Sequence, residues 1–157
     1  MCIRDSWYEG EEENPKMWKD FTDDIGIVIK TVIGRLKRCF ASAPAHQYVD
    51  RVQYRDIELG GEPVPIDWIQ ALLTKDKKWE GQREVRAFMM APDAREVFKP
   101  IDTGVFVPVL PNILIQRVHV APRAPQSTIE RVRAALDTAG LMDVPVARSA
   151  LKVAHHS

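Results

Sequence analysis

The chain has little cysteine and no long apolar run, and each absence excludes a class of protein. Its two cysteines, Cys2 and Cys39, stand in neither a CxxC pair nor any other metal-ligand spacing. A disulfide-stapled secreted scaffold and a cysteine-rich metal site are therefore excluded. No apolar run approaches the roughly 20 residues of a membrane span, and the N-terminus lacks the apolar stretch of a signal peptide. We therefore expect a soluble, cytoplasmic protein without a membrane partner.

The chain also has no excess of charge. Lys and Arg together number 22, and so do Asp and Glu, so no bulk positive field is available to attract nucleic acid. A protein partner stays possible, but the composition does not indicate which one. What the chain does have is 45% hydrophobic residues in 157 positions, enough for one domain with its own core.

Along its length, the sequence divides into four segments. Residues 1–6, MCIRDS, look like translated sequencing-adapter read-through of a metagenomic reading frame, and we leave them out of the expected fold. We expect an acidic N-terminal segment over 7–16, a single domain over 17–151 and a frayed tail over 152–157. The natural protein would then begin further upstream, and this chain would be its C-terminal part.

Hydrophobic spacing and turn residues predict an α+β fold, because helix and strand signals mix without regular βαβ alternation. We expect a mixed, mainly antiparallel sheet of about five strands with three or four packing helices. Val85–Ala91 is apolar on both faces, which is typical of an interior strand. The expected helices are 15–21, 32–40, 66–73 and 128–139, and the other expected strands are 26–30, 47–57, 104–109 and 113–120.

Individual residues predict where helices begin and end and which of their side chains are buried. Thr31 is expected to cap the helix that follows it, and Ser127 with Glu130 forms a capping-box pattern before a helix that Gly140 should end. Apolar side chains at helical spacing should be buried, and this set comprises Trp18, Phe21, Val32, Ile33, Leu36, Phe40, Trp68 and Leu72. His119 is interpreted as hydrogen-bonded structure, since no second His or Cys stands at metal spacing to it.

The best candidate site lies in the polar entry to the interior strand, Thr74–Met90. Gln82, Glu84 and Arg86 are spaced two apart, so an extended backbone would place all three on one face. Arg86 lies between apolar neighbours and needs a partner, and Glu84 is the nearest one on that face. Arg123 precedes a helix N-terminus and is a weaker candidate for holding an anion, with a packing connector preferred.

Several segments, taken in order, resemble one bacterial family. They are Met17-Trp18, Gly26–Ile29, Thr31, Arg35–Lys37, Val52–Asp56, Trp79–Arg86, Gly104–Val109, Val118–Pro125, Val144–Val146 and Arg148-Ser149. Their order and spacing are similar to the C-terminal portion of the domain of unknown function 2971 family, over nearly all of 17–151. Two positions depart from that family: Gln82 stands where its E-x-E-x-R pattern often has an acid, and Phe21 stands where it commonly has tyrosine.

Two functions stay open at this point. In the first, the chain is a binding, regulatory or defence-associated module, and Glu84 and Arg86 form a structural ion pair. In the second, Gln82-x-Glu84 resembles the motif of ADP-ribosyltransferases: Glu84 would stabilise an oxocarbenium-like ribose as NAD is cleaved, Gln82 would orient the acceptor, and Arg86 or Arg123 would contact phosphate. NAD is a cofactor only in this second case, and no metal is expected in either. A catalytic pair would line an open cleft, whereas a structural pair would be mutually bonded and covered.

Overall fold

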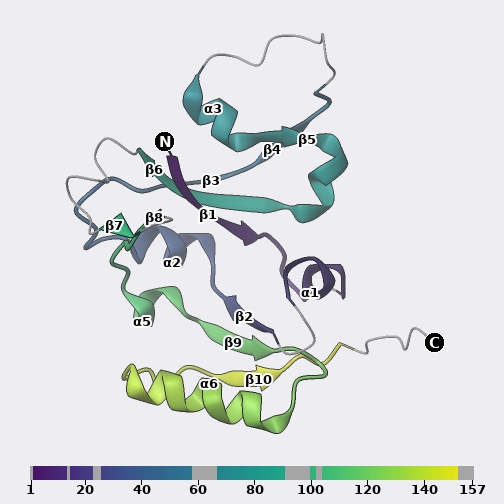
Figure 1. The fold of residues 1–157 in the computed structure, drawn as a ribbon, viewed down its shortest axis with the longest axis vertical. Helices are drawn as coiled ribbons and strands as arrows, with labels where there is room; N and C mark the ends of the chain where they lie inside the picture. Colours follow the sequence, from purple (N-terminus) through teal and green to yellow (C-terminus); the bar gives the residue numbers. More distant parts are fainter. Residues whose placement is uncertain are drawn as a thin grey trace. The chain divides into compact units, whose positions relative to one another are not determined.

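The computed structural model describes residues 2–13, 15–22, 26–57, 67–90, 100–101 and 104–151. The chain divides into two compact units, each assembled from two separate stretches. Unit 1 comprises residues 1–10 and 42–108, and unit 2 comprises 11–41 and 109–157. Both contain helices and small sheets (Figure 1), which confirms the predicted α+β class.

Unit 1 is built around strand β6, Glu84–Met90, which lies between β1, Cys2–Tyr8, and β3, Tyr48–Arg51. Both neighbours run antiparallel to it. The side chains of β6 are buried on both faces, from Val85 to Met89, because the strand alternates between two covered surfaces. The predicted interior strand is confirmed.

Strand β1 includes the residues that the sequence analysis left out of the fold. Its backbone pairs with β6 over its whole length, from Cys2 opposite Met90 to Tyr8 opposite Glu84. In the structure, residues 2–6 therefore complete the central sheet of unit 1. The foreign origin of residues 1–6 stays a prediction.

The rest of unit 1 consists of short elements. The predicted strand 47–57 is divided into β3 and β4 at Val52, whose backbone N–H donates to the Glu84 carbonyl oxygen at 2.9 Å. β4 pairs in parallel with β5, and β7 pairs antiparallel with β8. These elements are β4 (Gln53–Arg55), α3 (Trp68–Leu73), β5 (Thr74–Asp76), the 3₁₀ helix η1 (Lys77–Gln82), β7 (Pro100–Ile101) and β8 (Gly104–Val105).

Unit 2 contains a three-stranded sheet in the order β10-β9-β2, with β2 antiparallel and β10 parallel to the central β9. The parallel pair needs a crossover connection, and α6 provides it (Figure 1). The elements of unit 2 are α1 (Pro15–Phe21), β2 (Ile27–Lys30), α2 (Ile33–Arg38), α5 (Pro111–Leu114), β9 (Arg117–Val120), α6 (Gln126–Thr138) and β10 (Val146–Arg148).

Helix α6 packs on this sheet, as predicted, through an apolar cluster. Val118 of β9 and Leu136 of α6 are buried together with Leu141. Ile115, Val132, Val144 and Val146 pack against them. The spacing of Ile129, Val132 and Leu136 along the helix presents one apolar stripe, which explains why the sequence predicted this helix well.

Two features of the predicted sheet differ from the structure. The described strands form two three-stranded and two two-stranded sheets instead of one sheet of about five strands, although antiparallel pairs do predominate. The predicted strand 113–120 also begins too early, because α5 covers Pro111–Leu114 and β9 starts only at Arg117. Pro111 occupies the first turn of α5, where its fixed φ favours a helix start.

The predicted caps were wrong at two helix starts and correct at one helix end. The N-cap of α2 is Val32 and that of α6 is Pro125, and neither start has a side-chain cap hydrogen bond. Gly140 ends α6 with φ at +70°, and its N–H donates to the Asp137 carbonyl oxygen while Leu141 N–H donates to that of Leu136. This pair of bonds is a Schellman motif.

Burial agrees with the predicted core in part. Trp18 and Leu36 are buried, at 6% and 2% exposed, but Val32 is 49% and Trp68 is 38% exposed. Trp68 still makes edge contacts with the rings of Tyr48 and Phe88. The side chain of Phe21, residues 58–66 and 91–99, and the predicted tail 152–157 lie outside the described residues.

Candidate functional site

The backbone before β6 differs from the extended stretch that the sequence predicted. The side chain of Asp76 accepts the Lys78 N–H at 2.9 Å, and this cap favours a helical turn, so that η1 continues to Gln82. Arg83 then has a φ of +42°, which turns the chain into β6. Gln82 is therefore not on the strand face that Glu84 and Arg86 share, and this part of the prediction was wrong.

Glu84 and Arg86 form a buried ion pair on β6. Arg86 Nε donates to Glu84 Oε2 at 2.9 Å, and the two residues are 4% and 6% exposed, respectively. Arg86 Nη1 also donates to the Leu72 carbonyl oxygen of α3. The sequence predicted this pairing from period-two spacing, and the structure contains it.

Three further residues hold the Glu84 carboxylate and backbone. Lys75 Nζ of β5 lies 2.5 Å from Oε1, and Ser6 Oγ of β1 donates to Oε2 at 2.8 Å. Tyr54 Oη of β4 accepts the Glu84 backbone N–H at 2.8 Å. Lys75 Nζ also donates to the Gln82 side-chain oxygen, so Gln82 joins the cluster through Lys75. We call Ser6, Tyr54, Lys75, Gln82, Glu84 and Arg86 the Glu84 cluster.

The electrostatics of the Glu84 cluster favour the ionised carboxylate. Burial alone would raise the pKa of Glu84, but hydrogen bonds from Lys75, Arg86 and Ser6 together lower it to about 2. Burial raises the pKa of the Tyr54 phenol. At neutral pH Glu84 is thus a fixed negative charge, balanced by two cations that contact it directly.

Lys75, Ser6 and Tyr54 were not predicted as site residues from the sequence. Lys75 lies nine residues before Glu84 in sequence, and it reaches the carboxylate only because η1 reverses the chain between β5 and β6. The polar entry Thr74–Lys78 was the one available signal. Ser6 lies in residues 1–6, the segment predicted to be foreign. Lys75 and Arg86 lie outside that segment, so their contacts with Glu84 do not depend on whether residues 1–6 belong to the natural protein.

The remaining candidates lie in unit 2. Arg123 is exposed, in the turn between β9 and α6, whereas Gln82, Glu84 and Arg86 belong to unit 1. His119 on β9 has its Nδ1 2.5 Å from Glu13 Oε1, and Glu13 Oε2 accepts the indole N–H of Trp18 at 2.9 Å. Neither imidazole nitrogen has a hydrogen-bond partner among the described residues, so His119 packs against the Glu13 carboxylate and is not hydrogen-bonded as predicted.

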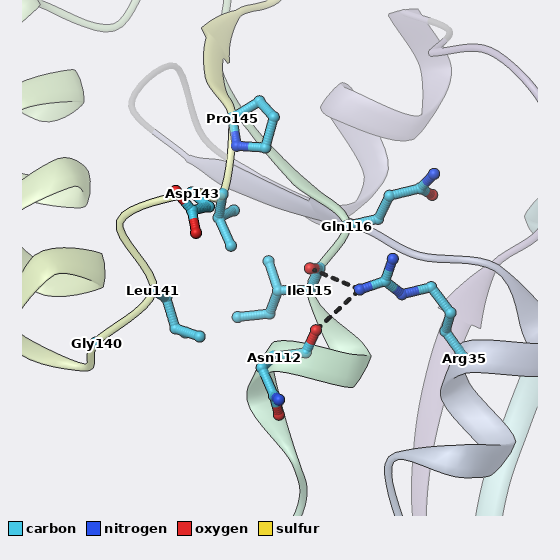
Figure 2. Close-up of a pocket in the computed structure, with 9 residues that line it drawn as sticks. Arg35, Asn112, Ile115, Gln116, Gly140, Leu141, Asp143 and Pro145 are labelled. Atoms are coloured by element: carbon cyan, nitrogen blue, oxygen red, sulfur yellow. Dashed lines mark hydrogen bonds between the residues drawn. The ribbon is translucent and has the colours of Figure 1, made fainter.

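Unit 2 also contains a pocket of about 320 Å³ beside α5. Arg35 of α2, the end of α5 and the turn between α6 and β10 line it (Figure 2). The predicted site residues Gln82, Glu84, Arg86 and Arg123 do not line this pocket.

The described residues contain no group of three or more His, Cys, Asp and Glu side chains suited to a metal ion. None of the helices in the described ranges has the length and hydropathy needed to cross a membrane. In comparisons with known proteins, no family model, no curated protein and no solved structure matches the chain. The resemblance to the domain of unknown function 2971 family therefore stays a prediction.

Proposed function

We propose that this chain is a binding or regulatory module, and that the Glu84 cluster is structural rather than catalytic. The observation that supports this is that other side chains already contact both oxygens of the Glu84 carboxylate. Oε1 contacts Lys75, Oε2 accepts from Arg86 and Ser6, and the residue is only 6% exposed. A carboxylate that stabilises a developing cation must face that cation in a preorganised, accessible site.

The contacts of the Glu84 cluster also suit a structural role, because they connect neighbouring elements of unit 1. Through Lys75, Ser6 and Arg86, the one carboxylate joins β6 to β5, β1 and, through the Leu72 carbonyl oxygen, α3. Removing one partner of such a buried pair leaves the other charge uncompensated, at a cost of about 3–5 kcal/mol. A contribution to stability of this size explains why Glu84, Lys75 and Arg86 lie together, and no catalytic role is needed to explain it.

The competing hypothesis is NAD cleavage, with Glu84 as the stabilising carboxylate and Gln82 as the orienting amide. In the structure the Gln82 side-chain oxygen accepts a hydrogen bond from Lys75, and the same lysine forms an ion pair with Glu84. NAD would have to displace Lys75 or Arg86 before either group acted on it. For this reason we favour the binding module.

The test is nicotinamide release from NAD, measured by chromatography for the full chain and for Glu84→Gln. Glu80→Gln is the matched control, because Glu80 lies on the exposed surface of η1. We expect no release by any of the three proteins. Release by the parent chain and by Glu80→Gln, lost in Glu84→Gln, would overturn the proposal.

Since Glu84→Gln is expected to weaken the fold, Gln82→Ala provides a second variant. Gln82 is half-buried and its side chain contacts Lys75, so truncating it removes the orienting amide with little loss of packing. If the parent chain released nicotinamide and folded Gln82→Ala did so far more slowly, the catalytic hypothesis would replace ours.

We further propose that the module acts in the bacterial cytoplasm, as a regulatory or defence-associated component, and belongs to the domain of unknown function 2971 family. Cys39 is a free, buried thiol, and a reducing compartment preserves such thiols. The order of segments from Met17 to Ser149 supports the family membership.

A further inference from the structure

Strand β2 lies at an edge of the unit 2 sheet (Figure 1). It pairs with β9 on one side, and no other described strand pairs with it. An open edge presents unpaired backbone N–H and C=O groups to which another strand can bind. At the opposite edge, the residues of β10 are all partly buried, whereas three of the four residues of β2 are exposed.

The register of β2 and β9 determines which backbone groups point outward. Ala121 N–H donates to the Gly26 carbonyl oxygen at 2.9 Å, so residue 26 is in a hydrogen-bonded pair of this antiparallel ladder. Bonded and non-bonded pairs alternate, so Val28 also bonds to β9. The N–H and C=O groups of Ile27 and Ile29 therefore point to the open edge, and no described residue hydrogen-bonds to them.

The side chains of Ile27 and Ile29 continue an apolar face that α6 covers only in part. In the register they lie opposite Val120 and Val118, so they share a face of the sheet with those residues. Val118 packs against α6, whereas Ile27 is 47% and Ile29 is 36% exposed. Exposed aliphatic side chains beside free backbone groups make this edge suited to association with another strand.

From these observations we propose that β2 pairs with β2 of a second copy of this chain, antiparallel and about a two-fold axis at Val28. Ile27 then lies opposite the partner's Ile29, and each such pair exchanges two backbone hydrogen bonds. This register places both isoleucines of one copy against isoleucines of the other, so their side chains cover one another. The two three-stranded sheets become one continuous sheet.

Charge and symmetry favour a second copy over a different partner. Lys30 is the charged residue of β2, and in this register it lies opposite the partner's Gly26, so no like charges face each other. The full chain has a formal net charge of zero, so two copies do not repel each other through bulk charge. A two-fold pair uses the same edge of both copies and closes it to further growth.

The proposed interface is small, because it is centred on a strand of four residues. Interfaces that bury less than about 1,200 Å² are typical of weak, transient association. We therefore expect a dissociation constant on the order of 100 µM. The monomer should predominate at about 10 µM and the dimer at about 1 mM.

The first test is sedimentation equilibrium of the full chain and of Ile29→Lys, between about 10 µM and 1 mM. An edge lysine opposes strand association, and we expect it to raise the dissociation constant about tenfold or more. Met142→Lys is the matched control, because Met142 is 74% exposed and lies after α6, outside β2. It should dimerise as the parent chain does.

Solvent exchange of single backbone amides, followed by NMR on the parent chain, locates the interface even if Ile29→Lys fails to fold. In the monomer the N–H groups of Ile27 and Ile29 point to the open edge, whereas that of Val28 bonds to β9. Exchange at Ile27 and Ile29 should slow about threefold between about 50 µM and 1 mM, as the dimer becomes populated. Exchange at Val28 should change far less.

Three results would overturn this inference. They are a chain that stays monomeric at about 1 mM, a folded Ile29→Lys that dimerises as tightly as the parent chain, and association without slower exchange at Ile27 and Ile29. Dimer formation depends on β2 in unit 2, whereas nicotinamide release is tested at Glu84 in unit 1. The proposed function and this inference can therefore fail independently.

Discussion

Replacing Glu84 with glutamine should change the pH dependence of stability as well as its magnitude. In the parent chain the pKa of Glu84 falls from 4.5 to about 2 on folding. A carboxyl whose folded pKa is lowered contributes stability above the unfolded pKa, and that stability is lost as pH falls through the folded pKa. The parent chain should therefore lose this contribution between about pH 5 and pH 2.

The expected magnitude follows from the same pKa values. A difference of one pKa unit corresponds to about 1.4 kcal/mol, so Glu84 contributes about 3 kcal/mol at neutral pH. Glutamine is neutral at every pH, and it leaves Arg86 buried, at 4% exposed, without its counter-charge. At pH 7 we expect the free energy of unfolding of Glu84→Gln to be about 3–5 kcal/mol lower than that of the parent chain. Near pH 2 this difference should be smaller by about 3 kcal/mol, because the parent chain has lost the contribution of the ionised carboxylate.

Urea denaturation followed by far-UV circular dichroism at pH 7, 5, 3 and 2 measures both quantities. Glu130→Gln is the matched control, since Glu130 is exposed on α6; its stability should follow that of the parent chain at every pH. If the free energies of the parent chain and Glu84→Gln stay parallel from pH 7 to pH 2, Glu84 is not ionised against Lys75 and Arg86, and the electrostatic reasoning fails.

Three other predictions concern single side chains. Gly140→Ala should lower the free energy of unfolding by about 1–2 kcal/mol, because φ is +70° there and no neighbour crowds a Cβ; an unchanged urea midpoint would contradict this. Asp67→Ala removes the acceptor of the Ile69 N–H at the start of α3 and should cost about 0.5–2 kcal/mol, with Asp67→Asn as the control that retains an acceptor. Cys39 is fully buried, and burial raises the pKa of its thiol, so iodoacetamide should label it only in denaturant; rapid labelling of the native chain, located by mass spectrometry, would refute this.

The sequence predicted those elements whose hydrophobic pattern is self-contained. Helix α6 and the interior strand β6 were both found, because their apolar spacing alone identifies the buried faces. The pairing of Glu84 with Arg86 was predicted for the same reason, since two residues on one strand share a face whatever their neighbours do. These predictions required no knowledge of distant contacts.

The features that were missed depend on contacts distant in sequence or on backbone detail. Lys75 reaches Glu84 through the turn of η1, and no periodicity encodes that reversal. Arg35 donates to carbonyl oxygens of α5, nearly eighty residues later in the chain, and nothing in the sequence around Arg35 indicates that contact. The division of one long predicted strand at Val52 depends on a backbone bond to Glu84, which only the assembled sheet provides.

The interleaved assembly of the two units has a consequence for synthesis and for truncation. During translation, unit 1 can be completed once residue 108 has emerged, whereas residues 11–41 must wait for 109–157 before unit 2 can close. Until then β2 has no β9 to pair with. No single cut yields either unit as one continuous piece. A fragment that ends at residue 108 keeps both stretches of unit 1 but lacks 109–157 of unit 2, so its β2 and α2 should be exposed to proteases.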